Sequence, residues 1–209
     1  RSGVVPPGDL RLSRTENLLY AAPAQSLAAA TDLAAPLAEV RTLGDSLEGE
    51  ARVVARAQAA LAIDSAESLK PGDRPVLLLS GGELTVTRTG DGVGGPNAEF
   101  CLALALALDG HPQMHALACD TDGVDGAAEV AGAVIGPNTL KTPGATEALA
   151  RNDAHSYFAR AGAQVVVIDD GRSFEHSVKL QGGRFVEFTM KAGFCLNPFS
   201  MIDATRAAE

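Results

Sequence analysis

The sequence predicts an α/β protein in which a mixed or largely parallel sheet is flanked by helices. Short apolar runs of strand length alternate with longer segments of helical pattern. The run at 75–79 is continuously apolar, which is typical of a strand that is covered on both faces, and 114–119 is expected to form another buried strand. The chain shows no internal repeat that would favour a solenoid or a propeller.

The first third of the chain is expected to hold two helices behind a leading loop. Residues 1–15 are rich in Pro, Gly and Arg and are expected to form a loop or linker. Pro23 can open an Ala-rich helix that runs to about residue 38. Residues 46–50 are expected to cap a second helix that continues to about residue 66. One face of that helix would hold Val53, Val54, Ala57, Leu61 and Ala62.

The remaining elements follow from the same patterns. Strands are expected at 17–21, 40–43, 75–79, 84–88, 114–119, 133–135, 164–168 and 184–188. Helices are expected at 96–108, at 173–180, and in two pieces over 138–161 that break near Pro143. The strand at 84–88 alternates apolar and polar residues, which is typical of a half-exposed or antiparallel strand.

Composition and charge narrow the classes of partner. Of the 209 residues, 46% are hydrophobic and 21% are charged, which indicates a soluble globular protein. The net charge of -9 argues against nucleic acid or an anionic membrane as a partner. It also opposes an anionic substrate, which would need local N–H groups, Arg or Lys, or a metal.

The cysteines and the apolar segments favour a cytoplasmic protein. Cys101, Cys119 and Cys195 show neither a CxxC motif nor a zinc-ligand spacing, which favours a reducing compartment. Residues 101–108 are too short to span a membrane and are expected to form a buried helix. The chain begins without Met, so we expect either a fragment or a chain whose beginning is missing.

Three junctions rich in glycine and acidic residues carry the functional hypothesis. They are 79–83 (LSGGE), 90–100 (GDGVGGPNAEF) and 120–126 (DTDGVDG). Each follows or precedes an apolar run. Glycine lets backbone N–H groups approach an anion, and clustered Asp can hold a divalent cation. This combination suits phosphate chemistry.

Two of the junctions supply candidate binding residues. Ser80, Gly81, Gly82 and Glu83 leave the end of a buried strand, where α/β folds place ligands. The helix after Gly94 and Gly95 is expected to aim free N–H groups at whatever that loop approaches. Asn97 and Glu99 lie in its first turn. Simple helix capping is the alternative explanation for these two residues.

The third junction supplies candidate catalytic residues. Asp120, Asp122 and Asp125 could bind Mg²⁺ or orient a hydroxyl group, and Asp122 is the candidate metal ligand. The alternative is a series of Asx turns that make a tight loop. The spacing differs from an EF-hand, and the chain has no P-loop. Lone Arg88 and Lys141 are possible anion partners, and the four histidines are interpreted as surface or core residues.

The glycines at 90, 92 and 95 also match the pattern Gly-x-Gly-x-x-Gly of dinucleotide-binding turns. A nicotinamide oxidoreductase is therefore an alternative. The strand before these glycines alternates, however, whereas the first strand of such a unit is buried on both faces. The first glycine also lies well after the end of that strand.

At these junctions the chain resembles the class II glycerate 2-kinases, a group often labelled hydroxypyruvate reductase, and especially their C-terminal MOFRL domain. The resemblance covers roughly residues 1–163. It rests on the order and spacing of several motifs: 79–83, 94–100, 105–109, 120–126, 131–134 and 151–153. Residues 43–51 (LGDSLEGEA) look like the end of the preceding domain of that family.

The resemblance implies a two-domain enzyme that transfers the γ-phosphoryl group of ATP, with Mg²⁺, to the 2-hydroxyl of D-glycerate. It implies that N–H groups around Gly81, Gly82, Gly94 and Gly95 face phosphate or the glycerate carboxylate. Asn97 and Glu99 would fix the loop or a ligand. Asp120, Asp122 or Asp125 would serve the metal or the hydroxyl.

The chain also departs from the family. Most of the N-terminal domain, which supplies the other wall of the cleft and a lysine, is expected to be missing. The segment 164–209 resembles TraC/VirB4-type ATPases of conjugation and type IV secretion just beyond their P-loop, which suggests a chimera; a divergent kinase tail is the alternative. The expected domains are 1–70, a remnant of the N-terminal domain, 71–163, the MOFRL-like domain, and 164–209, the foreign tail.

The sequence therefore leaves three functions open. The first is glycerate 2-kinase activity, or an incomplete or inactive remnant of it. The second is an NAD(P)-dependent hydroxypyruvate reductase. The third is a non-enzymatic chimeric fragment. The sequence sets neither the oligomeric state nor the nucleotide preference.

Overall fold

A computed structural model describes residues 5–6, 8–16, 22–126 and 130–162. By its internal contacts the chain divides into 1–168 and 169–209. The elements expected at 17–21, 164–168, 173–180 and 184–188 lie outside the described residues, as does the expected tail at 164–209. The described part of the leading segment holds a short 3-10 helix, Leu10–Leu12, in which the side chain of Asp9 accepts the backbone N–H of Arg11.

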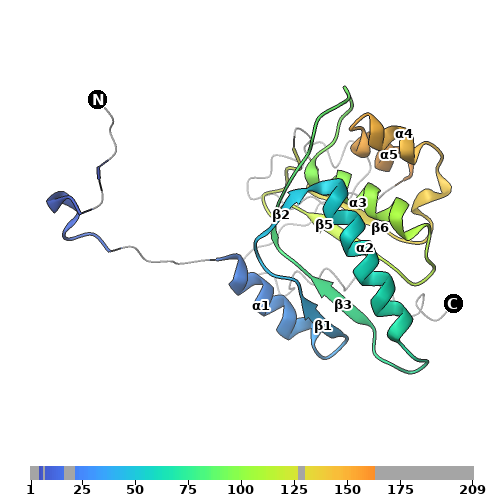
Figure 1. Ribbon diagram of the computed structural model, residues 1–209, viewed down its shortest axis with the longest axis horizontal. Helices are drawn as coiled ribbons and strands as arrows, with labels where there is room; N and C mark the ends of the chain where they lie inside the picture. The colour runs from blue at the N-terminus through green and yellow to red at the C-terminus, as the bar shows by residue number, and fades with distance from the viewer. Residues whose placement is uncertain (1–4, 7, 17–21, 127–129, 163–209) are drawn as a thin grey trace, which may run out of the picture. The chain divides into compact units, whose positions relative to one another are not determined.

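Two segments of the chain, 39–50 and 76–85, pair with each other twice as parallel strands. β1 (Glu39–Thr42) pairs with β3 (Val76–Leu79), and β2 (Leu47–Glu50) pairs with β4 (Gly82–Thr85). Hydrogen bonds bridge the gap between the pairs, because the N–H of Gly81 donates to Gly44 O at 2.9 Å and the N–H of Leu47 donates to Gly81 O at 2.9 Å. The two pairs are therefore joined by hydrogen bonds into one continuous ribbon, in which β2 follows β1 (Figure 1).

The third pair of strands is antiparallel. β5 (Ala116–Cys119) pairs with β6 (Gly132–Ile135), and both strands pack against α3 (Pro96–Leu108). The combination of parallel and antiparallel pairs with flanking helices confirms the predicted α/β class with a mixed sheet.

Helix α3 is the centre of the hydrophobic core. It has the bounds that the sequence predicts, and every residue from 98 to 105 is buried. A helix that is apolar on all sides must be covered on all sides. Helices α2 (Ala51–Ser68), α4 (Ala145–Ala150) and α5 (Ala154–Arg160) and the β5–β6 pair provide this cover.

Helix α2 corrects two predictions. Residues 47–50 form strand β2 because they pair with β4, and the helix begins only at Ala51 with Glu50 as its capping residue. The predicted apolar face is also wrong, since Val53 and Leu61 are 57% and 46% exposed. The buried positions, four residues apart, are instead Ala51, Ala55 and Ala59. These small side chains let α2 lie close to α3, and larger ones would hold the helices apart.

The other elements agree with the expected order and differ at their ends, and β5, which was expected to be buried, has Leu117 58% exposed. α1 (Pro23–Ala34) stops four residues early. β4 starts at Gly82 and ends at Thr85, not at 84–88, because its register is set by β2. The last helical region breaks near Pro143 as predicted, after a 3-10 turn at Thr139–Lys141, and breaks again at Asn152. No helix within the described residues is long and apolar enough to cross a membrane.

The close contact between α2 and α3 gives a first prediction. Ala55→Leu should lower the free energy of unfolding by about 1–3 kcal/mol, because the added methyl groups have no room between the helices. Urea unfolding followed by circular dichroism measures the change. Ala57→Leu adds the same group at an exposed position of the same helix and serves as control. Equal stability of the two variants would contradict the packing described here.

Candidate functional site

Asp125 joins the acidic loop to the start of α3. Its side chain is fully buried, and its two carboxylate oxygens accept the backbone N–H groups of Asn97 and Ala98, each at 2.8 Å. This is helix capping by a residue from a distant loop. The expectation that these N–H groups are free for a ligand is therefore wrong, because a carboxylate of the chain itself already holds them.

The side chain of Asn97 connects the same two junctions a second time. Its Nδ2 donates to Asp120 Oδ2 at 3.0 Å and to Asp125 Oδ1 at 3.3 Å. The backbone N–H of Asp120 donates to Ala131 O at 2.7 Å, next to strand β6. The structure thus brings the helix start and the acidic loop into direct contact.

Glu83, from the first junction, lies near enough to Asp120 for its charge to act on that carboxyl group. The pKa of Asp120 is raised, first because burial disfavours its charged form, and then because the negative charges of Asp122, Asp125 and Glu83 lie nearby. The hydrogen bond from Asn97 opposes this shift. We call Glu83, Asp120 and Asp122 the acidic cluster.

The acidic cluster is open and loosely bonded. Asp122 is exposed, and its Oδ1 accepts the N–H of Val124 at 3.0 Å, which is an Asx turn. Within the described residues no three His, Cys, Asp or Glu side chains are close enough together to hold a metal ion. In this structure the cluster offers carboxylate oxygens without a complete ligand set.

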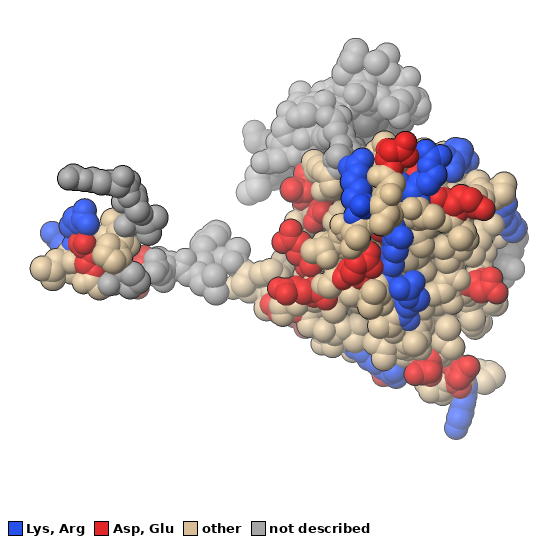
Figure 2. All heavy atoms as spheres, turned by 45° about the horizontal axis from the view of Figure 1, so that its top comes forward, with Lys and Arg blue, Asp and Glu red and all other residues tan. Residues whose placement is uncertain are grey.

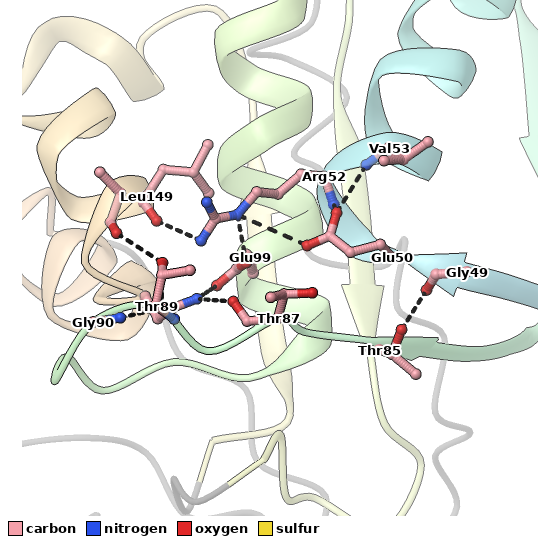
Figure 3. A network of polar contacts seen from close by, with 12 residues as sticks. Gly49, Glu50, Arg52, Val53, Thr85, Thr87, Thr89, Gly90, Glu99 and Leu149 are labelled. Atoms are coloured by element: carbon pink, nitrogen blue, oxygen red, sulfur yellow. Dashed lines mark hydrogen bonds and ion pairs between the residues drawn. The ribbon is translucent and has the colours of Figure 1, made fainter.

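Glu99 is buried in a polar network and does not face a cavity. Arg52 donates from Nε to Glu99 Oε1 at 2.6 Å and from its NH2 group to Leu149 O at 2.7 Å. Figure 3 shows Arg52 lying between Glu50, Glu99 and Leu149, which come from three different elements. The second oxygen of Glu99 accepts from Asn152 Nδ2 at 3.0 Å.

Asn152 holds the glycine loop in place. Its Oδ1 accepts the N–H groups of Thr89 at 2.7 Å and Gly90 at 2.9 Å, and its Nδ2 also donates to Thr87 O at 3.2 Å. The residue has a φ of 55°, in the left-handed region that Asn tolerates better than most residues. The network therefore runs from α2 through α3 to the loop before it.

Backbone packing explains the glycines of the 90–95 loop. A Cβ atom at Gly90 would lie 2.3 Å from Arg151 O, and one at Gly95 would lie 2.3 Å from Asp125 O. Such distances leave no space for any side chain. The resemblance to a dinucleotide fingerprint therefore has a packing explanation, and strand β4 ends at Thr85, well before the loop.

A cavity of about 200 Å³ lies on the open side of this loop. Its lining includes Arg88, Gly92, Gly94, Gly95, Gly126 and Asn152. The cavity therefore borders both the glycine loop and the end of the acidic loop. It contains the predicted binding residues Gly94 and Gly95.

A larger cavity of about 390 Å³ lies elsewhere, beside α1. It is lined by Leu27, Thr31, Thr42 and Asp45, where β1 ends. Gly81 approaches the same corner, but its N–H is already bonded to Gly44 O. Gly82 has a φ of 143° and packs on the backbone of Leu47. This cavity is larger, but the carboxylates that act on one another lie in the acidic cluster. We therefore regard the acidic cluster as the candidate functional site.

Three residues of the site escape sequence reasoning: Arg52, Asn152 and His155. The Nε2 atom of His155 lies 3.2 Å from Asp125 Oδ2 and 3.3 Å from Asp125 O, and the side chain is nearly buried, as a core histidine would be. All three contact partners that are distant in sequence. The motif at 151–153 was visible, but nothing in a single sequence indicates which partner each side chain takes.

The surface carries both signs of charge. Figure 2 shows acidic side chains gathered along one edge of the face that it presents, with basic side chains in a column beside them. The two cysteines in the described part are free; Cys101 is buried, which raises its pKa to about 12, and Cys119 is exposed. Neither lies in a CxxC motif.

Comparison with known proteins finds similarity to the MOFRL family, to putative hydroxypyruvate reductases and to glycerate kinases. Residues 76–174 match the model of the MOFRL family, so the match runs past the expected boundary at residue 163. A putative hydroxypyruvate reductase of Agrobacterium vitis is 42% identical over 159 residues, which are 71% of this chain and 36% of the relative. The D-glycerate 2-kinase of Thermotoga maritima is 32% identical over 126 residues, which are 58% of this chain and 30% of that protein.

Solved structures agree with these matches. The crystal structure of glycerate kinase from Thermotoga maritima has a TM-score of 0.63 at 27% identity and covers 70% of this chain and 37% of its own. A protein from Pyrococcus horikoshii OT3 has a TM-score of 0.65 at 28% identity, with coverages of 74% and 36%. The chain spans 36% to 38% of the length of the first curated relatives that it matches. Together these findings support the resemblance to the glycerate kinase and hydroxypyruvate reductase family.

The buried network gives a second prediction. Glu99→Gln should lower the free energy of unfolding by about 3 kcal/mol, because Arg52 loses the charge that compensates its own in a partly buried position. Chemical denaturation measures the loss. Glu48→Gln makes the same change at an exposed position and serves as control. A loss no larger than that of the control would show that the ion pair is not important for stability.

The acidic cluster gives a third prediction, on pH. Because the pKa of Asp120 is raised in the folded chain, the folded chain holds this proton more tightly than the unfolded chain does. Ionised Asp120 therefore destabilises the fold at pH 7, and this penalty disappears as the pH falls through the raised pKa. Asp120→Asn should make the chain slightly more stable at pH 7 and leave its stability unchanged below about pH 3.8. Thermal unfolding at both pH values checks this, and a destabilised variant at pH 7 would contradict it.

Proposed function

We propose that residues 22–162 form part of a glycerate 2-kinase-type phosphotransferase, in which a preceding domain supplies the other wall of the substrate cleft. The observation that carries this proposal is the match of residues 76–174, which hold the acidic cluster and the glycine loop, to the MOFRL family, together with the similarity of the chain to glycerate kinases in sequence and in structure. The reaction would move the γ-phosphoryl group of ATP to the 2-hydroxyl of D-glycerate.

Mg²⁺ fits the chemistry of the acidic cluster. Carboxylate oxygens are its preferred protein ligands, and it commonly takes only one or two of them while it keeps several waters. Asp120 uses one oxygen for Asn97, and Asp122 is exposed, so both can offer oxygens to a cation. When bound, the ion would neutralise phosphate charge. Burial raises the pKa of Asp120 most, and the neighbouring negative charges add to this shift; a bound cation would offset those charges.

The other predicted site residues take positioning roles in this proposal. Asp125 and Asn97 hold the acidic loop against α3, and Glu99 holds the glycine loop through Asn152. The N–H of Gly81 is already bonded, so the binding of anions falls to Gly94 and Gly95. Phosphoryl transfer depends mostly on positioning and charge, and these contacts supply the positioning.

A second candidate is an NAD(P)-dependent hydroxypyruvate reductase. It is favoured by the printed name of the two Agrobacterium vitis relatives, both 42% identical to this chain. The packing of the 90–95 glycines against Arg151 and Asp125 counts against it, since these glycines serve the fold on that side. A non-enzymatic chimeric fragment, with domains at 1–70, 71–163 and 164–209, remains the third possibility.

One pair of assays separates the candidates. The chain is incubated with ATP, Mg²⁺ and D-glycerate, and ADP release is measured; in parallel, NADH oxidation is measured with hydroxypyruvate. We expect ADP release only after the chain is joined to the N-terminal part of the Thermotoga maritima kinase. NADH oxidation would support the reductase, and failure of both assays in the joined protein would support the non-enzymatic fragment.

The role of Asp122 gives a fourth prediction. In the joined protein, Asp122→Asn should lower kcat/KM at least roughly tenfold, because an amide is a weaker ligand for Mg²⁺ and carries no charge. The fold should be unaffected, since the amide oxygen can still accept the N–H of Val124. Asp64→Asn, on the exposed side of α2, is the control. Unchanged kinetics in the Asp122 variant would remove this residue from the site.

A further inference from the structure

Arg88 is a positive charge without a carboxylate partner. It follows strand β4 and is exposed, and in the described part of the chain it makes no ion pair. We propose that Arg88, with the backbone N–H groups of Gly94 and Gly95, forms a binding subsite for a small oxyanion, a carboxylate or a phosphate. This inference deepens the proposed function and rests on it for the identity of the anion.

Backbone carbonyl groups of the loop hold the guanidinium group of Arg88 and leave some of its N–H donors free. Its Nε lies 3.3 Å from Gly90 O and its NH2 group lies 3.4 Å from Gly92 O, both long contacts to the loop backbone. Arg has five N–H donors in a planar fork that matches carboxylate and phosphate geometry. Two donors are used by the loop, and the others remain for a ligand.

The backbone of the same cavity adds further donors. The N–H groups of α3 at Asn97 and Ala98 are taken by Asp125, but those of Gly94 and Gly95 donate to no acceptor within the described residues. Both glycines line the cavity of about 200 Å³ with Arg88. Adjacent N–H groups in a concave site favour an anion.

The nearby carboxylates do not compete for Arg88. Asp91 pairs with Arg151 at 3.1 Å. Asp153 accepts from Ser156 at 2.6 Å and from the N–H of Val93 at 3.0 Å. Hydrogen bonds and charge at these partners hold the pKa values of both groups below their usual range, so both are ionised but already bonded. In a chain with a net charge of -9, a local cation of this kind is what a small anion requires.

Binding of two anions to the full 209-residue chain tests the proposal without any need for turnover. Inorganic phosphate and D-glycerate are titrated separately, and then each against the other, by isothermal calorimetry or by NMR. Arg88→Gln removes the charge, Arg88→Lys keeps it but removes the fork, and Arg56→Gln removes an exposed charge on α2 as the control. Circular dichroism confirms the fold of each variant.

We expect at least one of the two anions to bind, with affinity weakened roughly tenfold or more in Arg88→Gln, less in Arg88→Lys and not at all in Arg56→Gln. Binding of D-glycerate alone would assign the carboxylate, and binding of phosphate alone would assign a phosphoryl group. Absence of binding to the unaltered chain, or equal affinities in Arg88→Gln and Arg56→Gln, would overturn the subsite. A third outcome separates the two proposals. If Arg88→Gln loses anion binding, but the unaltered chain shows no kinase activity when joined to the N-terminal part of the Thermotoga maritima kinase, the subsite is kept and the proposed function is rejected.

Discussion

The rest of the structure depends on the buried carboxylate of Glu99. It lies on the central helix, and its two oxygens bind Arg52 from α2 and Asn152 from the joint between α4 and α5. A buried charge is unfavourable without partners, so all three elements must be in place together. Asn152 then fixes the glycine loop, and Arg52 fixes the end of α4. The ion pair between Arg52 and Glu99 therefore helps to fix the position of the glycine loop and of the cavity beside it.

The start of α3 extends the same dependence to the acidic loop. Its N–H groups are satisfied by Asp125, and Asn97 reaches from the helix to Asp120. The pKa of Asp120 is raised there, first by burial and then by the negative charges of Asp122, Asp125 and Glu83. Carboxyl groups whose pKa is shifted by burial and by neighbouring charges are common at functional sites.

The sequence predicted most of this fold, because periodicity is a local property. The bounds of α3 follow from Pro96 and a continuous apolar run. The face of α2 was misjudged because size, not hydrophobicity, decides which side meets a closely packed neighbour. The three junctions can be recognised in the sequence, but the contacts of Asp125 and Glu99 join residues 28 and 53 positions away, and no local pattern encodes them.

The left-handed backbone at Asn152 restricts evolution at that position. Glycine could adopt the same φ but would lose every side-chain contact to the loop and to Glu99. Aspartate could adopt it as well, but it would place a second negative charge beside a fully enclosed one. Other residues would strain the chain. Asparagine alone meets both the conformational and the chemical requirement at this position. Related proteins that keep the same glycine loop should therefore also keep this asparagine.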